Sequence, residues 1–278
     1  RRGPVSLPLW IAARYLRTRR QSGFITVLTG ISVGGVAVGV TALLTVLAVM
    51  NGFENEVQTR IAGTDAHVVL LGESAAGVTD ADSLASLVAR RPGVEGVAPF
   101  TYAKAIVFHD GLTEGLVVKG VDLRAERAVT SVGRNIEPPL DSIPSRGADG
   151  TPGIVLGSEL AARLAARVGD RVVLAAIGEG EASAFGFAPR LREFRLVGVF
   201  TSGLYTYDSS LGFTSIRASQ EFFGLGDAVT GLEVRIRDMF AAPRLAEELL
   251  EAVPGRGLRA NNWMELNRNL FTWMKLEK

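Results

Sequence analysis

The sequence contains no cysteine and only two histidines among its 278 residues. The missing thiols exclude disulfide bonds, cysteine nucleophiles and cysteine-ligated metal sites. His67 and His109 are too few for a histidine-rich metal site, and no H-x-x-x-H spacing occurs. The sequence therefore predicts no metal site.

Motifs of nucleotide binding and hydrolysis are also missing. The sequence has no G-x-x-x-x-G-K-[ST] loop for ATP and no G-x-S-x-G nucleophile elbow. Glu179 and Glu181 lie in a glycine-rich loop, and His109 precedes Asp110 at a predicted turn, so we interpret these groups as solvated. We predict no catalytic residues, no cofactor and no enzymatic activity.

An excess of charge of one sign is absent as well. The chain has 30 basic and 29 acidic residues, a net charge of +1, which gives no electrostatic argument for nucleic acid as a partner. The basic residues concentrate near the N-terminus. Residues 1–23, which include the stretch PLWIAARYLRTRR, are predicted to form a basic amphipathic segment that contacts membrane lipid on the cytoplasmic side.

The longest feature that is present is an uncharged run from Phe24 to Met50. About 20 apolar residues suffice to cross a hydrocarbon core of roughly 30 Å. Arginines precede the run, and Glu54 and Glu56 follow it, so residues 24–50 are predicted to cross the membrane with the N-terminus in the cytoplasm. A buried soluble helix and a cleaved signal peptide are the alternatives; the apolar region of a signal peptide has only 7–15 residues.

Glycines recur within this run at a spacing of four. Gly30 with Gly34, and Gly35 with Gly39, form two small-xxx-small pairs, which allow a second helix to approach the backbone closely. The alternative is that glycine is simply common in membrane helices. We predict that these four glycines pack against a neighbouring helix.

The remainder of the chain alternates strand and helix patterns, which predicts an α+β fold. Strands are expected at 67–71, 95–98, 101–109, 115–121, 154–156, 171–175, 193–200 and 231–237. Helices are expected from Asp80 to before Pro92 and at 159–167, 242–253 and 263–278, and residues 133–153 are expected to be an irregular connection.

Residues 176–192, AIGEGEASAFGFAPRLR, lie between two predicted strands and are expected to extend them into a long hairpin. Phe185, Phe187 and Pro189 are apolar residues near its middle. They can fold back onto the core, or they can form an exposed tip that docks on a partner. The residues alone leave both alternatives open.

Four stretches resemble the LolC/LolE transmembrane subunits of the lipoprotein-releasing ABC transporter. They are ARYLRTRR, GISVGGVAVGVTALLTVLAVMNGFENEVQTRI, VLGSELAARLAARVGDRVVL and WMELNRNLFTWMKLEK. The third is shared more widely by MacB-like outer domains, and the tip of the hairpin does not match residue for residue. The resemblance covers essentially the whole chain and implies an FtsX-like permease with a MacB-like periplasmic domain.

The resemblance implies four membrane helices, of which this chain would hold the first, followed by a periplasmic domain at 51–262. Residues 263–278 would lead to a second membrane helix, and we expect the chain to be a fragment of a protein of a Gram-negative inner membrane. Such a subunit pairs with an identical or homologous LolC/LolE-type subunit and binds a cytoplasmic LolD-like ATPase. It extracts a lipoprotein and passes it to a soluble LolA-like carrier.

Site residues follow from the same resemblance. The hairpin at 176–192 corresponds to the hook that captures the carrier, with Phe185, Phe187 and Pro189 near its tip and Arg190 and Arg192 at its returning base. Leu47, Met50 and Phe53 are candidates for lining the lipoprotein cavity, although they can equally face lipid.

Two other functions remain open at this point. A MacB-like or other FtsX-type permease would use the same architecture for efflux or signalling. A single-pass anchored periplasmic enzyme or sensor belongs to another class, and three further hydrophobic spans after Lys278 would exclude it.

Overall fold

The computed structural model describes residues 10, 11, 14, 23–64, 66–73, 77–130, 136–137, 149–183, 186–253 and 255–268, and at 51, 53–64, 177–183 and 186–188 it describes the backbone alone. The chain divides into two compact units, Arg1–Glu56 and Val57–Lys278. Most of the predicted basic segment 1–23 lies outside the described residues.

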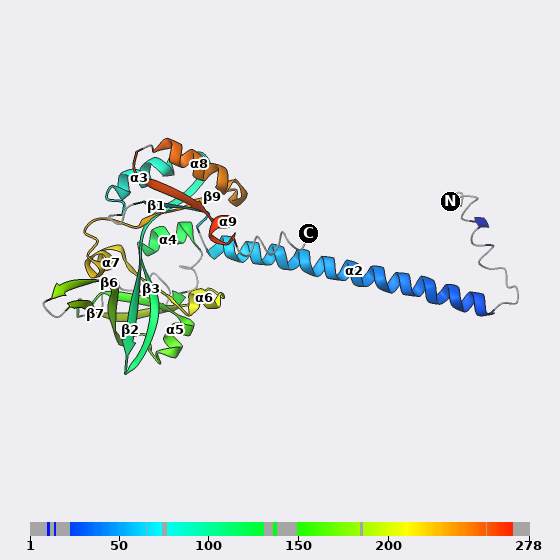
Figure 1. The fold of residues 1–278 in the computed structure, drawn as a ribbon, viewed down its shortest axis with the longest axis horizontal. Helices are drawn as coiled ribbons and strands as arrows, with labels where there is room; N and C mark the ends of the chain where they lie inside the picture. Colours follow the sequence, from blue (N-terminus) through cyan, green and yellow to red (C-terminus); the bar gives the residue numbers. More distant parts are fainter. Residues whose placement is uncertain are drawn as a thin grey trace. The chain divides into compact units, whose positions relative to one another are not determined.

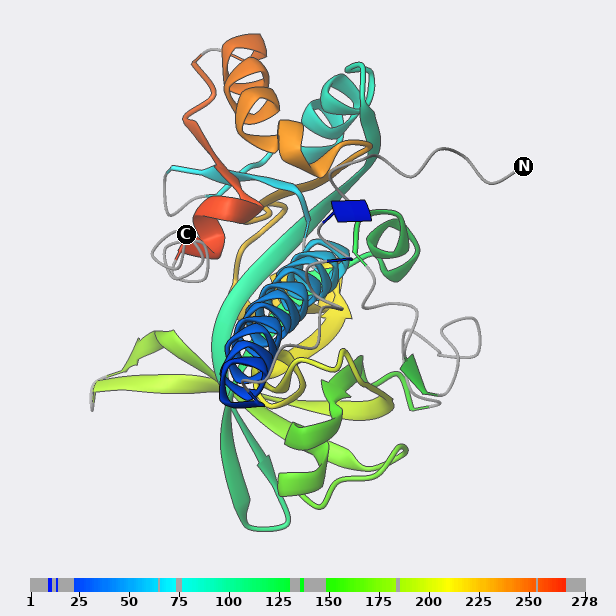
Figure 2. The same ribbon diagram turned by 90° about the vertical axis from the view of Figure 1, so that its right-hand side faces the viewer.

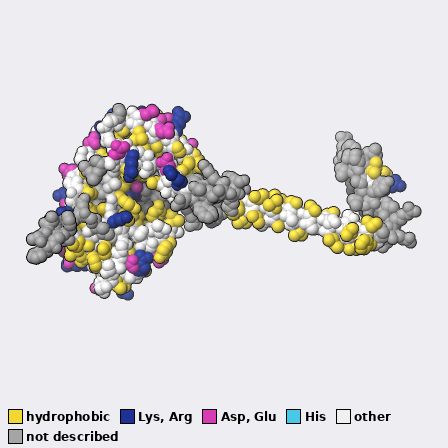
Figure 3. Space-filling model, viewed as in Figure 1, with side chains coloured by type: hydrophobic (Ala, Val, Ile, Leu, Met, Phe, Trp, Pro, Cys, Tyr) yellow, Lys and Arg dark blue, Asp and Glu magenta, His cyan; other side chains and the backbone are white. Residues whose placement is uncertain are grey.

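Helix α2, Gly23–Thr64, makes up most of the first unit, and its last residues, from Val57, belong to the second. Its part Gly23–Met50 has a mean hydropathy of 2.3 and is long and apolar enough to cross a membrane. Many apolar side chains lie on the surface of this part of the helix, where no other described part of the chain covers them (Figure 3). The helix does not end with the apolar run, because its backbone continues to Thr64 (Figure 1).

The second unit is a mixed α/β domain. Its described strands are β1 (Val68–Gly72), β2 (Val94–His109), β3 (Leu112–Val121), β4 (Ile136–Glu137), β5 (Gly153–Gly157), β6 (Arg171–Ser183), β7 (Gly186–Phe200), β8 (Leu211–Ser215), β9 (Gly231–Ile236) and β10 (Leu258–Asn262). Its described helices are α3 (Ala81–Ala89), α4 (Leu123–Val129), α5 (Ser158–Arg163), α6 (Tyr205–Asp208), α7 (Ile216–Phe223), η3 (Met239–Ala241), α8 (Ala242–Ala252) and α9 (Trp263–Leu266).

Strand β2 joins two lobes of this domain. Its first half pairs antiparallel with β9, which continues through β1 to β10. Helices α3 and α8 lie side by side over this first lobe in both views (Figures 1 and 2). Leu84 of α3, Leu249 of α8 and Trp263 are buried together against β1 and β9, and they form the core of this lobe.

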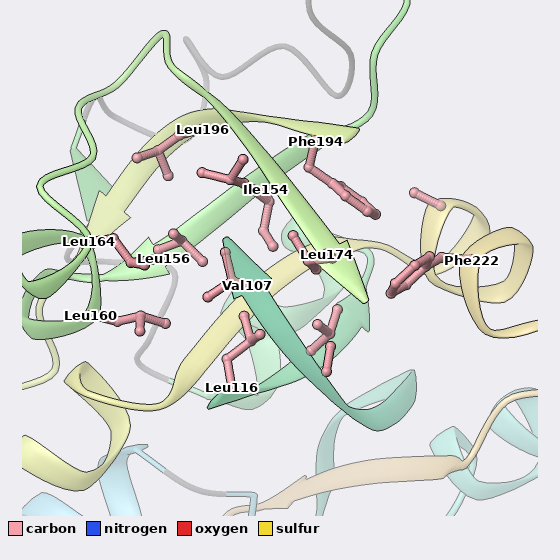
Figure 4. Packing of buried hydrophobic residues seen from close by; sticks show 14 of the residues in the cluster. Val107, Leu116, Ile154, Leu156, Leu160, Leu164, Leu174, Phe194, Leu196 and Phe222 are labelled. Atoms are coloured by element: carbon pink, nitrogen blue, oxygen red, sulfur yellow. The ribbon is translucent and has the colours of Figure 1, made fainter. Parts of the chain in front are cut away.

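The second half of β2 belongs to a closed ring of strands. The pairings run from β2 to β3, β8, β5, β7 and β6, and β6 pairs again with β2. Alternate side chains of these strands point into the ring, where Val107, Leu116, Leu156 and Leu174 pack together (Figure 4). We call this second lobe the barrel.

The predicted fold class is confirmed: an apolar N-terminal helix precedes a mixed α/β domain. The predicted strands at 67–71, 154–156 and 231–237 correspond to β1, β5 and β9, and the predicted helix at 242–253 corresponds to α8. The three strands are short, mostly buried runs rich in Val, Leu and Ile, and α8 has apolar residues at helical spacing.

Several boundaries differ from the prediction. The expected strands 95–98 and 101–109 form one strand, β2, because the φ angle that proline requires is compatible with extended backbone and Pro99 pairs with Leu232. Helix α5 ends at Arg163 rather than at residue 167, and Ala165 has a φ of 51°. Helix α9 is described as Trp263–Leu266, and residues 269–278 lie outside the described residues.

Candidate partner-docking site

The hairpin of β6 and β7 extends away from the barrel (Figures 1 and 2). Strand β6 pairs with β2 only up to Ala176, and β7 begins to pair with β5 at Arg195. Farther out, the described backbone pairs Gly180 with Pro189 and Ser183 with Gly186. The outer part is therefore a ribbon of two strands with no described third strand beside it.

The predicted tip residues fall on this ribbon to different extents. Phe187 pairs with Ala182 near the outer end, and only its backbone is described. Pro189 is exposed, as is Leu191, which has 61% of its surface accessible. Phe185 lies outside the described residues. The predicted hairpin extension is thus present, and the roles of these residues in binding stay predictions.

Arg190 and Arg192 lie at the root of the ribbon and donate hydrogen bonds to helix α7. Arg190 Nη1 lies 3.2 Å from the carbonyl oxygen of Phe222, and Arg192 Nη1 lies 3.4 Å from that of Ala218. Arg192 Nη2 lies 2.9 Å from Glu221 Oε2. Hydrogen bonds from Arg192 and Arg217 hold the pKa of Glu221 below its ordinary value.

Sequence reasoning missed helix α7 and strand β8 before it. Strand β8 has only five residues, and α7 is a short helix whose Phe222 and Phe223 are its only aromatic residues. The local signals that could have found α7 are Phe222 and Phe223 at helical spacing from Ala218 and Ser219, and two boundary residues. The Ser215 hydroxyl accepts a hydrogen bond from Ala218 N, and Gly224, with a φ of 70°, ends the helix. Both are typical helix boundary residues.

The predicted packing residues lie along helix α2. Apart from the neighbouring backbone of α2 itself, a Cβ atom added at Gly30, Gly34, Gly35 or Gly39 would meet no described atom within 4 Å, so these positions are open to a second helix. Leu47 is exposed and Met50 is half-buried, whereas only the backbone is described at Phe53. The packing and cavity assignments stay predictions.

Both histidine rings contact backbone carbonyl oxygens of the domain. His67 is buried, and its Nδ1 lies 2.9 Å from the carbonyl oxygen of Ile236. The interpretation of His109 as solvated is wrong, because its side chain is only 9% exposed and its Nε2 lies 3.5 Å from Asp170 Oδ2. The strand pairing causes this burial, since the end of β2 lies beside the start of β6 and His109 Nδ1 reaches Arg171 O at 3.0 Å. Within the described part of the chain, no group of three metal-ligating side chains is found.

An ion-pair cluster of Asp149, Arg171 and Arg195 lies at the start of strand β6. Asp149 Oδ2 lies 2.9 Å from Arg171 Nη2 and 2.9 Å from Arg195 Nη2. Hydrogen bonds from Thr151 and Arg195 hold the pKa of Asp149 below its ordinary value. The cluster ties the segment before β5 to strands β6 and β7.

The domain matches a known family over most of its length. The family described as the MacB-like periplasmic core domain matches residues 29–252. This chain belongs to that family. The MacB-like core domain therefore covers much of helix α2 and the domain as far as α8, and the hairpin lies within it.

Individual relatives of this MacB-like chain are transmembrane proteins of lipoprotein-releasing systems. It is 33% identical to LolC of Neisseria meningitidis serogroup B over 98% of this chain and 65% of that protein. It is 30% identical to LolC of Xylella fastidiosa strain Temecula1, over 98% of this chain and 64% of that protein. It is 28% identical to LolE of Haemophilus influenzae, over 94% of this chain and 62% of that protein. The predicted LolC/LolE resemblance is confirmed, and the chain spans less than two thirds of the length of each of these relatives.

A solved structure is also similar in part. The periplasmic region of MacB from Actinobacillus actinomycetemcomitans has a TM-score of 0.47 and 14% sequence identity, over 76% of this chain and 95% of that one.

Proposed function

We propose that this chain is part of a membrane subunit of an ATP-driven transporter that extracts lipoproteins from the inner membrane and passes them to a periplasmic carrier. The observation that carries the proposal is the 33% identity to Neisseria meningitidis LolC over 98% of the chain. A similarity of this extent includes both the apolar helix and the domain that follows it.

In this proposal the subunit does mechanical work and has no catalytic residues of its own. Helix α2 crosses the inner membrane of a Gram-negative bacterium with its N-terminus in the cytoplasm, and the MacB-like domain lies in the periplasm. ATP is hydrolysed by a separate LolD-like ATPase. A second LolC/LolE-type subunit packs against α2 through Gly30, Gly34, Gly35 and Gly39, which are open in this chain.

The hairpin of β6 and β7 is proposed to dock a LolA-like carrier. It extends beyond the barrel as a ribbon of two strands, and its described outer part includes the exposed residues Pro189 and Leu191. Exposed apolar groups on an element that a rigid body holds outward are typical of contact sites. Phe185 and Phe187 are proposed to contribute the apolar anchors.

The lipoprotein itself is proposed to leave the membrane past the outer end of the apolar run. Leu47 and Met50 lie there on helix α2, followed by Phe53. The exposed side chain of Leu47 supports this assignment, because it is free to contact acyl chains.

Site-specific photocrosslinking from position 187, in the complete protein in cells, tests the proposal. A crosslink to a small soluble periplasmic carrier is the expected result. The matched control carries the photocrosslinker at Leu112, an exposed residue at the outer end of the other long hairpin, β2–β3. Capture of nothing, or of the neighbouring subunit alone, from position 187 would contradict carrier docking and favour an FtsX-type permease with another cargo.

A further inference from the structure

Among the described residues, no third strand lies beside the outer part of the β6–β7 hairpin to fix its direction. Its strand partners lie within the hairpin from Gly180 to Ser183 and from Gly186 to Pro189, among the residues that the structure describes. The register between the two strands shifts between Ala175 and Gly180. An isolated two-stranded ribbon is at best marginally stable in water. Contacts at its root must therefore set where the ribbon points.

Two arginines supply such contacts, and both are directed at one helix. Arg190 donates to the carbonyl oxygen of Phe222, and Arg192 donates to that of Ala218 and to the carboxylate of Glu221. A cation near the C-terminal end of a helix is favoured by the helix dipole, and Arg190 donates to one of the last four carbonyl groups of α7, which lack partners in the helix. Ala218, which accepts from Arg192, lies earlier in the helix. The next residue after α7, Gly224, leaves room for the Arg190 guanidinium, because a Cβ there would lie 2.9 Å from its Nη1.

Helix α7 is itself fixed to the body of the domain. Phe222 is fully buried at the end of the barrel, where its ring lies edge-on to that of Phe194 at 5.6 Å (Figure 4). On another side of the helix, Thr101 of β2 donates a 2.7 Å hydrogen bond to Ser219. Gly120 of β3 also has no room for a Cβ beside Ser219, so the helix lies directly on the strands.

We propose that Arg190 and Arg192 are positioning residues, which set the direction of the hairpin by holding its root against helix α7. Glu221 is also a positioning residue, because its carboxylate accepts a hydrogen bond from Arg192. This inference rests on the proposed function only in taking the hairpin as the docking element. A ribbon held in one direction loses less conformational freedom when a partner binds, which increases affinity.

The absence of cysteine allows a direct measurement of the direction of the hairpin. Spin labels are attached to cysteines introduced at Ala182 on the hairpin and at the exposed Ser86 on α3, in the full chain in lipid nanodiscs. The distribution of distances between the labels is measured by double electron–electron resonance. The Arg192→Gln and Glu221→Gln variants should broaden this distribution, and Arg190→Gln should broaden it further when combined with either one.

Arg217→Gln is the matched control. Arg217 also pairs with Glu221, at 3.0 Å, but it lies on α7, is 82% exposed and has no described contact with the hairpin. Its removal should leave the distance distribution unchanged. The double variant Arg192→Glu/Glu221→Arg exchanges the two charges. Its distance distribution should be narrower than that of either single charge reversal. General damage to the fold would not produce this rescue.

Binding of the carrier captured by the crosslinking experiment is measured on the same variants. We expect affinity to fall about tenfold in Glu221→Gln as well as in Arg192→Gln, which corresponds to the loss of one charge-assisted hydrogen bond. A loss of affinity in Arg192→Gln alone, with unchanged distances, would show that Arg192 contacts the carrier directly and would overturn the proposal.

The distances also separate this inference from the proposed function. Unchanged distances in both Arg192→Gln and Glu221→Gln overturn the positioning role, whatever the carrier does. Broadened distances in a protein whose unmodified form binds no carrier would support the positioning role and contradict carrier docking.

Discussion

Lys119 of strand β3 donates a 2.7 Å hydrogen bond to Glu233 of strand β9, although strand β2 lies between them in the sheet. The same ammonium lies 2.8 Å from Glu126 Oε1 of helix α4. All three side chains are buried. Burial by itself would lower the pKa of Lys119, but the carboxylates of Glu233 and Glu126 raise it above its ordinary value. One buried cation thus joins two strands and a helix of the domain.

Replacing Lys119 with methionine should lower the free energy of unfolding by about 3–5 kcal/mol, because two carboxylates lose their buried partner. Thermal and urea unfolding of the detergent-solubilised chain measure the change. Lys104→Met, on the exposed face of β2, is the control and should have little effect. Adding Glu126→Gln and Glu233→Gln to Lys119→Met should restore part of the stability. A further loss in that triple variant would contradict the explanation by unpaired charge.

Trp263 should contribute strongly to stability, since it is fully buried and its Nε1 donates a 2.8 Å hydrogen bond to the carbonyl oxygen of Met239. Trp263→Ala is expected to cost about 3–5 kcal/mol in the same unfolding experiments. Leu266→Ala, at an exposed position of the same short helix, should change stability by less than about 0.5 kcal/mol. Equal effects of the two substitutions would refute the core assignment of Trp263.

The Asp149 cluster should make stability depend on acidic pH. The folded-state pKa of Asp149 lies below the unfolded value of about 3.9. The contribution of Asp149 to the free energy of unfolding is therefore present above about pH 4 and is lost as the pH falls through the folded-state pKa. Asp149→Asn should therefore lose less stability than the unmodified chain when the pH is lowered from 5 to 2. Acid-unfolding curves measure this difference, with the exposed Asp227→Asn as the control. Parallel curves for the unmodified chain and Asp149→Asn would rule out this role.

Phe187→Asp should abolish carrier binding and leave the protein folded and inserted in the membrane, because a charge at a desolvated apolar anchor is costly. A pull-down with the carrier measures binding, and circular dichroism with membrane fractionation measures folding and insertion. Leu112→Asp places the same charge at the end of the β2–β3 hairpin and should leave binding intact. Unchanged binding by Phe187→Asp would remove Phe187 from the docking site.

Gly34→Leu should weaken the association of helix α2 with a neighbouring helix, because the added side chain prevents close approach of the two backbones. The yield of the purified complex in detergent measures this effect. Val36→Leu is the control, since two residues correspond to about 200° around the helix and place it away from Gly34. Normal recovery of the complex with Gly34→Leu would show that the glycine does not lie at the interface.

The sequence alone was sufficient for elements whose signal is local. The run from Phe24 to Met50 is uncharged over its whole length, and a helix satisfies the backbone hydrogen bonds of a single such segment within that segment. The hairpin extension at 176–192 was also predictable, because the strands on both sides of it have their own apolar patterns. These features depend on neighbours in the sequence.

The tertiary structure alone decided which distant residues meet. Nothing near Lys119 in the sequence indicates that it is buried with Glu233, 114 positions away. Likewise, the sequence places Arg192 at the base of a hairpin, but only the fold brings Glu221 of α7 beside it. The physical reason is that a side chain's charge partners and burial depend on which strands pair and how the ring of strands closes. Those pairings join segments far apart in the chain and leave no local pattern to read.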